Sequence, residues 1–221
     1  MKNKHGFTLL EMAIALIVIA LLVSGVFVAQ DLIQNAKLKA FASQITHYKK
    51  AYHDFEDIYN AKAGDFSAAQ AIWGSDVQNG NGDNVISFCD GFAGAYCDYY
   101  ESFYAWEHIE KAELLQLGGL TGDVVSSTCF VPTQSDNVPA TNMLTNFVYL
   151  VDNNKLYVSE FGQTLTICHA SLEDYHNGEI DEEITNALDS IMDDGNTATG
   201  NIIRHSRILP KRTAWLEINL E

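Results

Sequence analysis

One uncharged, apolar run near the N-terminus restricts the architecture of this chain more than any other feature. It covers residues 12–29, eighteen positions without a charged side chain, and residues 7–10 extend it on the other side of Glu11. A helix of that length is sufficient to span the hydrocarbon core of a bilayer. Lys2 and Lys4 precede the run, so the positive-inside rule predicts a cytoplasmic N-terminus. We therefore expect one membrane span followed by an exported head.

The charges of the chain are unevenly distributed. The 221 residues include 13 Lys and Arg against 29 Asp and Glu, a formal net charge of −16. Residues 1–50 carry a net +4 and residues 51–221 a net −20. So acidic a head repels polyphosphates, which excludes direct binding of nucleic acid by most of the chain. Since 47% of the residues are hydrophobic and 11% aromatic, the head has enough apolar surface to fold.

All four cysteines follow the apolar run, at positions 89, 97, 129 and 168. An even number in an exported head predicts two disulfides, and the sequence allows three pairings. We favour Cys89–Cys97, which closes a short glycine-containing loop, and Cys129–Cys168, which ties two separate segments of the head. No pair has the CxxC spacing of zinc sites.

The string from Lys4 to Glu11, KHGFTLLE, is the most specific motif of the chain. A carboxylate inside an apolar run is costly, and such groups are usually functional. The string resembles the class III signal of type IV prepilins and type II secretion pseudopilins, in which a short basic leader ends in Gly and is followed by Phe-Thr-Leu-x-Glu and an apolar helix. The alternative is that Glu11 lies at the level of the lipid headgroups.

The resemblance implies a specific processing event. A prepilin peptidase would cut between Gly6 and Phe7 on the cytoplasmic face and methylate the new amine of Phe7. The apolar helix would be kept, and Glu11 would face the Phe7 amine of a neighbouring subunit in a filament. Such a pair attracts strongly in a low-dielectric bundle and is penalised when one partner is missing.

A second helical pattern follows the apolar run. No proline occurs between residues 7 and 59, so we predict one helix about 80 Å long. Its second half carries an apolar stripe with spacings of three and four that could pack on the head or form a two-stranded coiled coil. We favour packing on the head because the head needs a core. The stripe consists of Leu38, Phe41, Ile45, Tyr48, Tyr52, Phe55 and Tyr59.

The head is expected to hold an antiparallel sheet against this helix, which gives an α+β pilin fold. The predicted organisation is a leader at 1–6, a transmembrane and polymerisation helix at 7–30, its amphipathic continuation at 31–60 and a disulfide-bonded head at 61–221. The predicted elements of the head are a short helix from residue 101 ending before Gly118, a hairpin of strands 147–151 and 155–159, a strand at 164–168, a helix at 179–192 and a strand at 214–220.

Two later segments also resemble a group of bacterial pilin-like proteins. Residues 59–66, YNAKAGDF, resemble a Tyr-Asn-Ala-Leu-Pro-Gly-Asp-Phe segment, with Lys62 and Ala63 in place of Leu-Pro. Residues 187–189, ALD, and 193–196, DDGN, together with Gly200, resemble an Asp-Asp-Gly segment near the end of those proteins. The resemblance therefore extends over most of the chain, although only its first part is sharply specific.

The segment 79–90 has the spacing of a calcium loop. Asn79, Asn81, Asp83 and Asp90 supply oxygens, while Asn84 can adopt a turn conformation usually given to glycine. The competing interpretation is an Asn-Gly turn without a metal. A second oxygen cluster is formed by Asp193, Asp194 and Asn196, with a helix C-terminal turn as its alternative. We therefore expect no required cofactor, with Ca²⁺ as a candidate ligand.

Enzymatic interpretations have little support. Seven histidines show no HExxH motif, and no serine lies in a GxSxG elbow. A basic cluster near the C-terminus is expected to pair with the acidic head or a neighbouring subunit rather than with nucleic acid. It consists of Arg204, Arg207, Lys211 and Arg212.

Together these features favour a structural subunit of a type IV pilus or type II secretion pseudopilus, not an enzyme. The head is large for a major pseudopilin, which favours a minor subunit. The expected partners are other pilin or pseudopilin subunits, prepilin peptidase, an inner-membrane assembly platform and membrane lipid. The expected location is the bacterial inner membrane with the head in the periplasm, and then the filament. The alternatives are a low-copy adhesive or substrate-recognising pilin and a membrane-anchored exported hydrolase.

Overall fold

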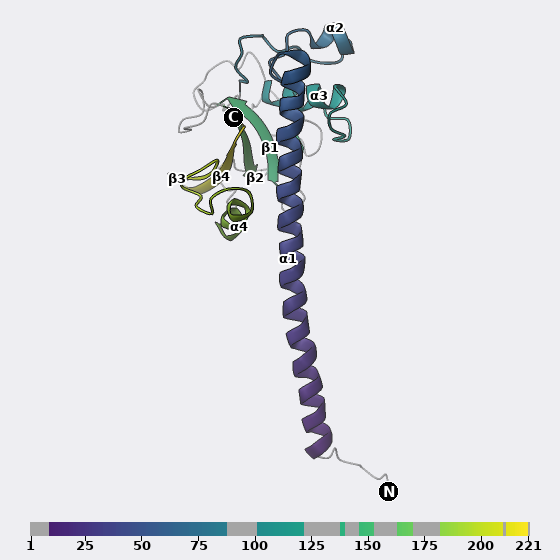
Figure 1. Cartoon of the computed structure of the whole chain (residues 1–221), viewed down its shortest axis with the longest axis vertical. Helices are drawn as coiled ribbons and strands as arrows, with labels where there is room; N and C mark the ends of the chain where they lie inside the picture. The colour runs from purple at the N-terminus through teal and green to yellow at the C-terminus, as the bar shows by residue number, and fades with distance from the viewer. Residues whose placement is uncertain are drawn as a thin grey trace.

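The computed structural model describes residues 9–87, 101–121, 138–139, 146–152, 163–169, 182–209 and 211–220. Four helices are present in these residues: α1 (Leu9–Tyr59), α2 (Ala69–Trp73), α3 (Glu101–Lys111) and α4 (Glu182–Met192). Four strands are present: β1 (Asn146–Asp152), β2 (Gln163–His169), β3 (Ile202–Leu209) and β4 (Lys211–Asn219). The predicted α+β arrangement of a long N-terminal helix and an antiparallel sheet is confirmed (Figure 1).

Helix α1 projects far beyond the head (Figure 1). Its 51 residues are continuous, as the absence of proline predicted, and Gly25 does not interrupt it. All residues from 9 to 37 are exposed, and burial begins at Leu38. The predicted stripe is buried from Leu38 to Phe55, while Tyr59 is half-buried. This stripe packs in one core with β2 and β4 rather than forming a separate coiled coil within the chain.

The four strands form one antiparallel sheet in the order β1-β2-β4-β3. Apolar residues that alternate along the two central strands are buried, as expected for a sheet with one face against a core. These are Leu165 and Ile167 on β2 and Leu216 and Ile218 on β4. The predicted strand at 164–168 and helix at 179–192 correspond to β2 and α4. The predicted hairpin partner 155–159 lies outside the described residues, and β1 pairs with β2.

Strand β3 was missed because its sequence reads as a charge cluster rather than as a strand. It lies at the edge of the sheet and pairs only with β4 among the described residues, with Ile202 opposite Ile218. Edge strands tolerate charged side chains, which also oppose unwanted pairing. Arg204 Nη1 lies 3.7 Å from Glu182 Oε2, consistent with the expected pairing of the basic cluster with the acidic head. The other three side chains of that cluster are not described.

Helix α3 ends earlier than its apolar pattern indicated. Its last residue is Lys111, and Glu113 adopts a positive φ of 60°. The following turn is held by Glu110, which accepts backbone N–H groups through both carboxylate oxygens. Its Oε1 accepts from Leu117, Gly118 and Gly119 at 3.2, 2.9 and 2.8 Å, and its Oε2 from Leu120 at 2.7 Å.

Candidate functional site

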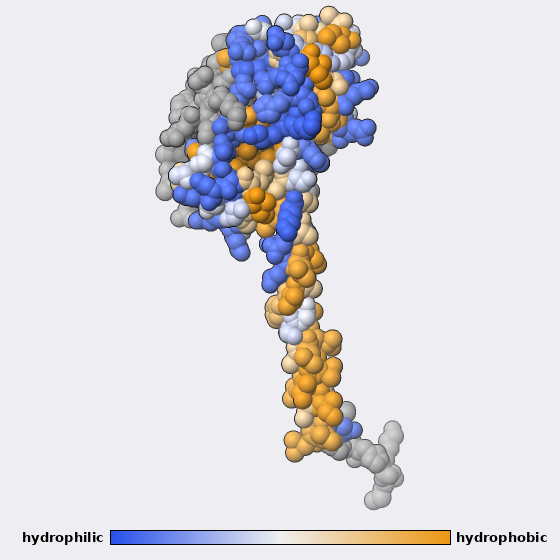
Figure 2. Space-filling model, in the orientation of Figure 1, coloured by the Kyte–Doolittle hydropathy of each residue, from blue (hydrophilic) through white to orange (hydrophobic). Residues whose placement is uncertain are grey.

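The exposed half of α1 is the largest apolar surface of the described chain. In the space-filling view it forms an apolar column below a largely hydrophilic head (Figure 2). Among the helices in the described residues, α1 alone is long and apolar enough to cross a membrane. A continuous apolar surface of this size requires cover by lipid or by other proteins. Glu11 lies in the first turn of this helix, whereas Gly6 and Phe7 lie outside the described residues.

In the head, hydrogen bonds to Asp65 hold the loop that the sequence predicts to be a calcium loop. Its carboxylate is buried and accepts three backbone N–H groups. Oδ1 accepts from Gly82 at 2.6 Å and Asp83 at 3.1 Å, and Oδ2 accepts from Asn84 at 2.7 Å. Asn84 has a φ of 67°, the turn conformation expected from the sequence. The residues after the helix also hold this loop through Lys62, whose Nζ donates to the Asn84 carbonyl at 2.6 Å.

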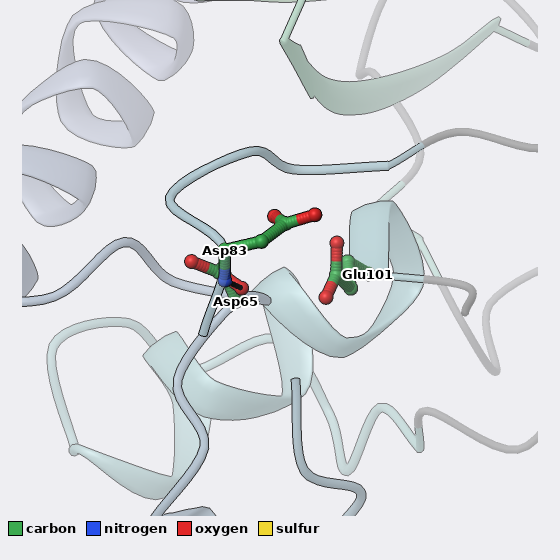
Figure 3. Close-up of side chains that lie close together, drawn as sticks. All are labelled: Asp65, Asp83 and Glu101. Carbon is green, nitrogen blue, oxygen red and sulfur yellow. Dashed lines mark hydrogen bonds between the residues drawn. The ribbon is translucent and has the colours of Figure 1, made fainter. Parts of the chain in front are cut away.

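Glu101, at the start of α3, fastens the same loop from the other side. Its Oε1 accepts from the Asn81 N–H at 2.9 Å, and its Oε2 accepts from the N–H and hydroxyl of Ser87 at 2.9 and 2.8 Å. Burial raises the pKa of the Glu101 carboxyl, while the bonds from Asn81 and Ser87 oppose that effect. Asp65, Asp83 and Glu101 each place a carboxylate oxygen within 4.8 Å of the others (Figure 3).

The predicted calcium ligands are used largely within the loop itself. The side-chain oxygen of Asn79 accepts from Gln70 N at 2.9 Å, that of Asn81 from Asp83 N at 2.7 Å, and that of Asp83 from Val85 N at 3.0 Å. Asp90 lies outside the described residues. This bonding supports the turn interpretation, and calcium at the loop stays a prediction. Asp65 and Glu101 were not predicted from the sequence as site residues, although Asp65 lies in the segment 59–66 that resembles pilin-like proteins.

His108 is neutral, and its ring forms hydrogen bonds to the backbone of Gly64, after α1, and of Gln78, before the loop. Its Nδ1 accepts from the Gly64 N–H at 3.0 Å, and its Nε2 donates to the Gln78 carbonyl at 2.7 Å. Glu107 Oε2 accepts from the Gln78 N–H at 3.3 Å. The ring stacks on Phe55 of α1, with 6.2 Å between the ring centroids. Burial lowers the pKa of His108 to about 4, although the bond to the Gln78 carbonyl acts in the opposite direction.

Because His108 is buried with a lowered pKa, we expect the folded protein to lose stability in mild acid. The unfolded chain binds a proton near pH 6.5, whereas the folded chain does not until about pH 4. Stability is therefore complete above pH 6.5 and falls as the pH falls toward 4. Between pH 7 and pH 5 the expected loss is about 2 kcal/mol in the free energy of unfolding of the full chain in detergent micelles. His108→Gln should reduce this pH dependence, and an unchanged dependence would contradict the assignment.

A second acidic cluster lies where α4 ends. Asp189, Asp193 and Asp194 each place a carboxylate oxygen within 4.8 Å of the others. Asp193 and Asp194 were predicted from the sequence, together with Asn196, as an oxygen cluster. Asp189 was quoted only for its resemblance to pilin-like proteins and was not placed in the oxygen cluster, although the i, i+4 spacing of Asp189 and Asp193 at a helix end was the available signal. The Asn196 side-chain oxygen accepts from Ala198 N at 3.2 Å.

The predicted disulfides are not tested by the structure. Cys89, Cys97 and Cys129 lie outside the described residues. Cys168 lies on β2, opposite Phe147 of β1, but its side chain is not described. Both pairings therefore stay predictions.

The geometry defines an α+β protein with a membrane-type helix and a separate polar head. Residues 1–27 match the family model of the prokaryotic N-terminal methylation motif. The chain thus carries the prepilin signal of type IV pilins and pseudopilins, the signal of a prepilin peptidase substrate. Comparison of the chain with curated proteins and with solved structures gave no match.

Proposed function

We propose that this chain is a minor structural subunit of a type IV pilus or a type II secretion pseudopilus. The observation that carries the proposal is the continuity of the methylation motif at 1–27 with a helix whose residues 9–37 are exposed. Nothing in the described head covers that part of the helix. Its apolar surface suits a bilayer first and the helices of neighbouring subunits afterwards.

Processing creates the positively charged amine of Phe7 with which Glu11 can pair. Cleavage between Gly6 and Phe7 leaves an amine on Phe7, four residues before Glu11. In a packed bundle of helices, both charges lose their contact with water, which costs several kcal/mol per ion unless they pair. Pairing of Glu11 with the Phe7 amine of the next subunit fixes the axial register of the two helices. The role of the chain is structural rather than enzymatic.

The location and partners follow from the same orientation. The basic leader stays in the cytoplasm, the helix spans the inner membrane, and the acidic head lies in the periplasm until assembly. The partners are prepilin peptidase, other pilin or pseudopilin subunits, the assembly platform and lipid. The size of the head favours a minor subunit. Quantitative mass spectrometry of purified filaments measures the copy number of this chain, which we expect to be lower than that of the major subunit.

The processing step gives the first test. When the full chain is expressed with an active prepilin peptidase, the expected product lacks residues 1–6 and carries one methyl group on the amine of Phe7. Intact mass and N-terminal sequencing measure both changes, and expression with an inactive peptidase is the control. An uncut chain, or a cut after the apolar run, contradicts the proposed processing.

A further inference from the structure

Two Asn-Gly pairs follow each other in the loop that Asp65 and Glu101 hold. They are Asn79–Gly80 and Asn81–Gly82. Asn-Gly pairs are prone to deamidation, because glycine has no Cβ to shield its backbone nitrogen from the side chain before it. In this reaction the glycine nitrogen attacks Cγ of the asparagine. The second pair is exposed, so water can take part in the reaction there.

The covalent change at Asn81 would proceed in two steps. The Gly82 nitrogen forms a bond to Asn81 Cγ, and the bond from Cγ to the side-chain nitrogen breaks. Ammonia leaves with the proton that the Gly82 nitrogen gives up. Solvent water then opens the succinimide ring, its hydroxyl adding to one carbonyl carbon and its proton to the ring nitrogen. The product is aspartate or isoaspartate, and either one adds a negative charge to the loop.

The side-chain carbonyl of Asn81 is not the group that prevents this attack. Its Oδ1 accepts from the Asp83 N–H at 2.7 Å, an Asx turn that keeps the side chain beside the following peptide. The bond also polarises the carbonyl, which makes Cγ more electrophilic. Protection of this pair in the folded chain therefore has to act on the nitrogen of Gly82.

The Gly82 nitrogen is held by the carboxylate of Asp65. Its N–H donates to Asp65 Oδ1 at 2.6 Å, and Asp65 is buried at the base of the loop (Figure 3). A hydrogen bond to a carboxylate is about twice as strong as one between neutral groups. The carboxylate also opposes the negative charge that develops when the nitrogen loses its proton. The nitrogen is therefore a poor nucleophile while this bond persists.

Rotation of that nitrogen toward the side chain of Asn81 would break neighbouring hydrogen bonds as well. Asp65 also accepts from the N–H groups of Asp83 and Asn84, at 3.1 and 2.7 Å. Glu101 accepts from the N–H of Asn81 itself at 2.9 Å. These bonds fasten the backbone on both sides of the reacting peptide, and each one lost adds to the barrier.

The first Asn-Gly pair is held in a different way. The Gly80 N–H donates to the backbone carbonyl of Phe66 at 3.1 Å, and the Asn79 side-chain oxygen accepts from Gln70 N at 2.9 Å. The hydrogen bond to the Gly80 nitrogen thus does not involve the Asp65 side chain. The chain therefore contains an internal reference for any effect of that side chain.

We propose that Asn81–Gly82 is a latent deamidation site that Asp65 keeps unreactive by holding the Gly82 N–H. The inference is independent of the proposed role in a filament. Deamidation would add a carboxylate close to Asp83 and Glu101, where like charges already oppose one another. An isoaspartate would also lengthen the loop backbone by one methylene group. Asp65 therefore protects the loop chemically as well as holding its shape.

Peptide mapping by mass spectrometry tests this assignment on the full chain, incubated in detergent micelles in mildly alkaline buffer. Conversion is followed at Asn79 and Asn81 in the same molecules, and the chain in urea gives the unprotected rate. In the folded wild type we expect both rates to lie far below that rate. Asp65→Ala should raise the rate at Asn81 by about tenfold to a hundredfold, as expected for loss of one hydrogen bond to a charged group, and leave Asn79 unchanged. Asp76→Ala, at an exposed position before the loop, is the matched control and should behave as the wild type.

Several outcomes would overturn the proposal. One is a rate at Asn81 in the folded wild type equal to that in urea, and another is an Asp65→Ala chain in which Asn81 reacts no faster. Faster reaction at Asn79 and Asn81 together would report unfolding of that variant. Asp65→Asn then decides, because it keeps the side-chain shape and an acceptor oxygen but removes the charge. Faster reaction at Asn81 alone in Asp65→Asn supports the proposal, and any other result overturns it.

Discussion

Glu11→Ala is expected to exclude the chain from filaments while its processing continues normally. The substitution leaves Gly6 and Phe7 intact, so the peptidase still has its cleavage site. It removes the carboxylate that would meet the Phe7 amine of the next subunit, and an unpartnered buried charge costs about 3–5 kcal/mol. We expect incorporation into filaments to fall by about a hundredfold or more, because each 1.4 kcal/mol is a factor of ten. Comparison of the processed chain in sheared filaments and in membranes measures this directly.

Asp31→Ala provides a matched control for Glu11→Ala. Asp31 is the other carboxylate on the exposed half of α1, and it lies beyond the uncharged run at 12–29. Its replacement also removes one negative charge from the same helix. We expect incorporation close to that of the wild type. Equal incorporation of the Glu11→Ala chain would refute the pairing of Glu11 with Phe7, and loss of processing would show that Glu11 acts earlier.

Gly64→Ala adds one methyl group to the head, and we expect it to lower the free energy of unfolding more than Gly118→Ala does. Gly64 has a φ of 95°, and a Cβ at this position would lie 2.3 Å from the Glu101 carbonyl oxygen. The strained backbone costs about 1–2 kcal/mol, and the overlap with the backbone of α3 adds about 1–3 kcal/mol. The expected loss in the free energy of unfolding is therefore about 2–5 kcal/mol.

Two further glycines separate these contributions. Gly118 has a similar φ of 101°, but a Cβ there meets nothing within 4 Å, so Gly118→Ala should cost only the backbone strain of about 1–2 kcal/mol. Gly80 has no such φ, but its Cβ would lie 2.3 Å from the Gly64 carbonyl oxygen. Urea unfolding of the full chain in detergent micelles, followed by tryptophan fluorescence, measures all three. A Gly64→Ala chain no less stable than Gly118→Ala would contradict the close packing of this loop on α3.

The features that could be predicted from the sequence are those determined by neighbouring residues. The uncharged run and the missing prolines specify a continuous helix, because both act within a few turns. The stripe from Leu38 to Phe55 specifies which face of that helix is buried, since its spacing follows the helical period. The strands at β2 and β4 could be located from their alternating apolar residues for the same reason.

The features that could not be predicted depend on contacts between distant segments. Glu101 accepts N–H groups from residues 14 and 20 positions earlier in the chain, and no local pattern marks such a contact. The burial of Asp189 depends on how α4 packs against α1 and β3. In β3 the charged side chains hide the strand period, because an edge strand does not need to be apolar. The buried members of the two acidic clusters, Asp65, Glu101 and Asp189, therefore arise from tertiary structure rather than from motifs.

The continuity of α1 has a mechanical consequence. Residues 9–37 and the buried stripe that begins at Leu38 belong to one unbroken helix, so an axial pull on the membrane segment is transmitted directly to the core of the head. That core includes Tyr48, whose ring meets Trp106 of α3 edge to face at 5.1 Å. No hinge in the described helix relieves the load, so withdrawing the subunit from the bilayer moves helix and head together. In the proposed filament, axial forces would consequently be resisted by the same aromatic contacts that stabilise the head.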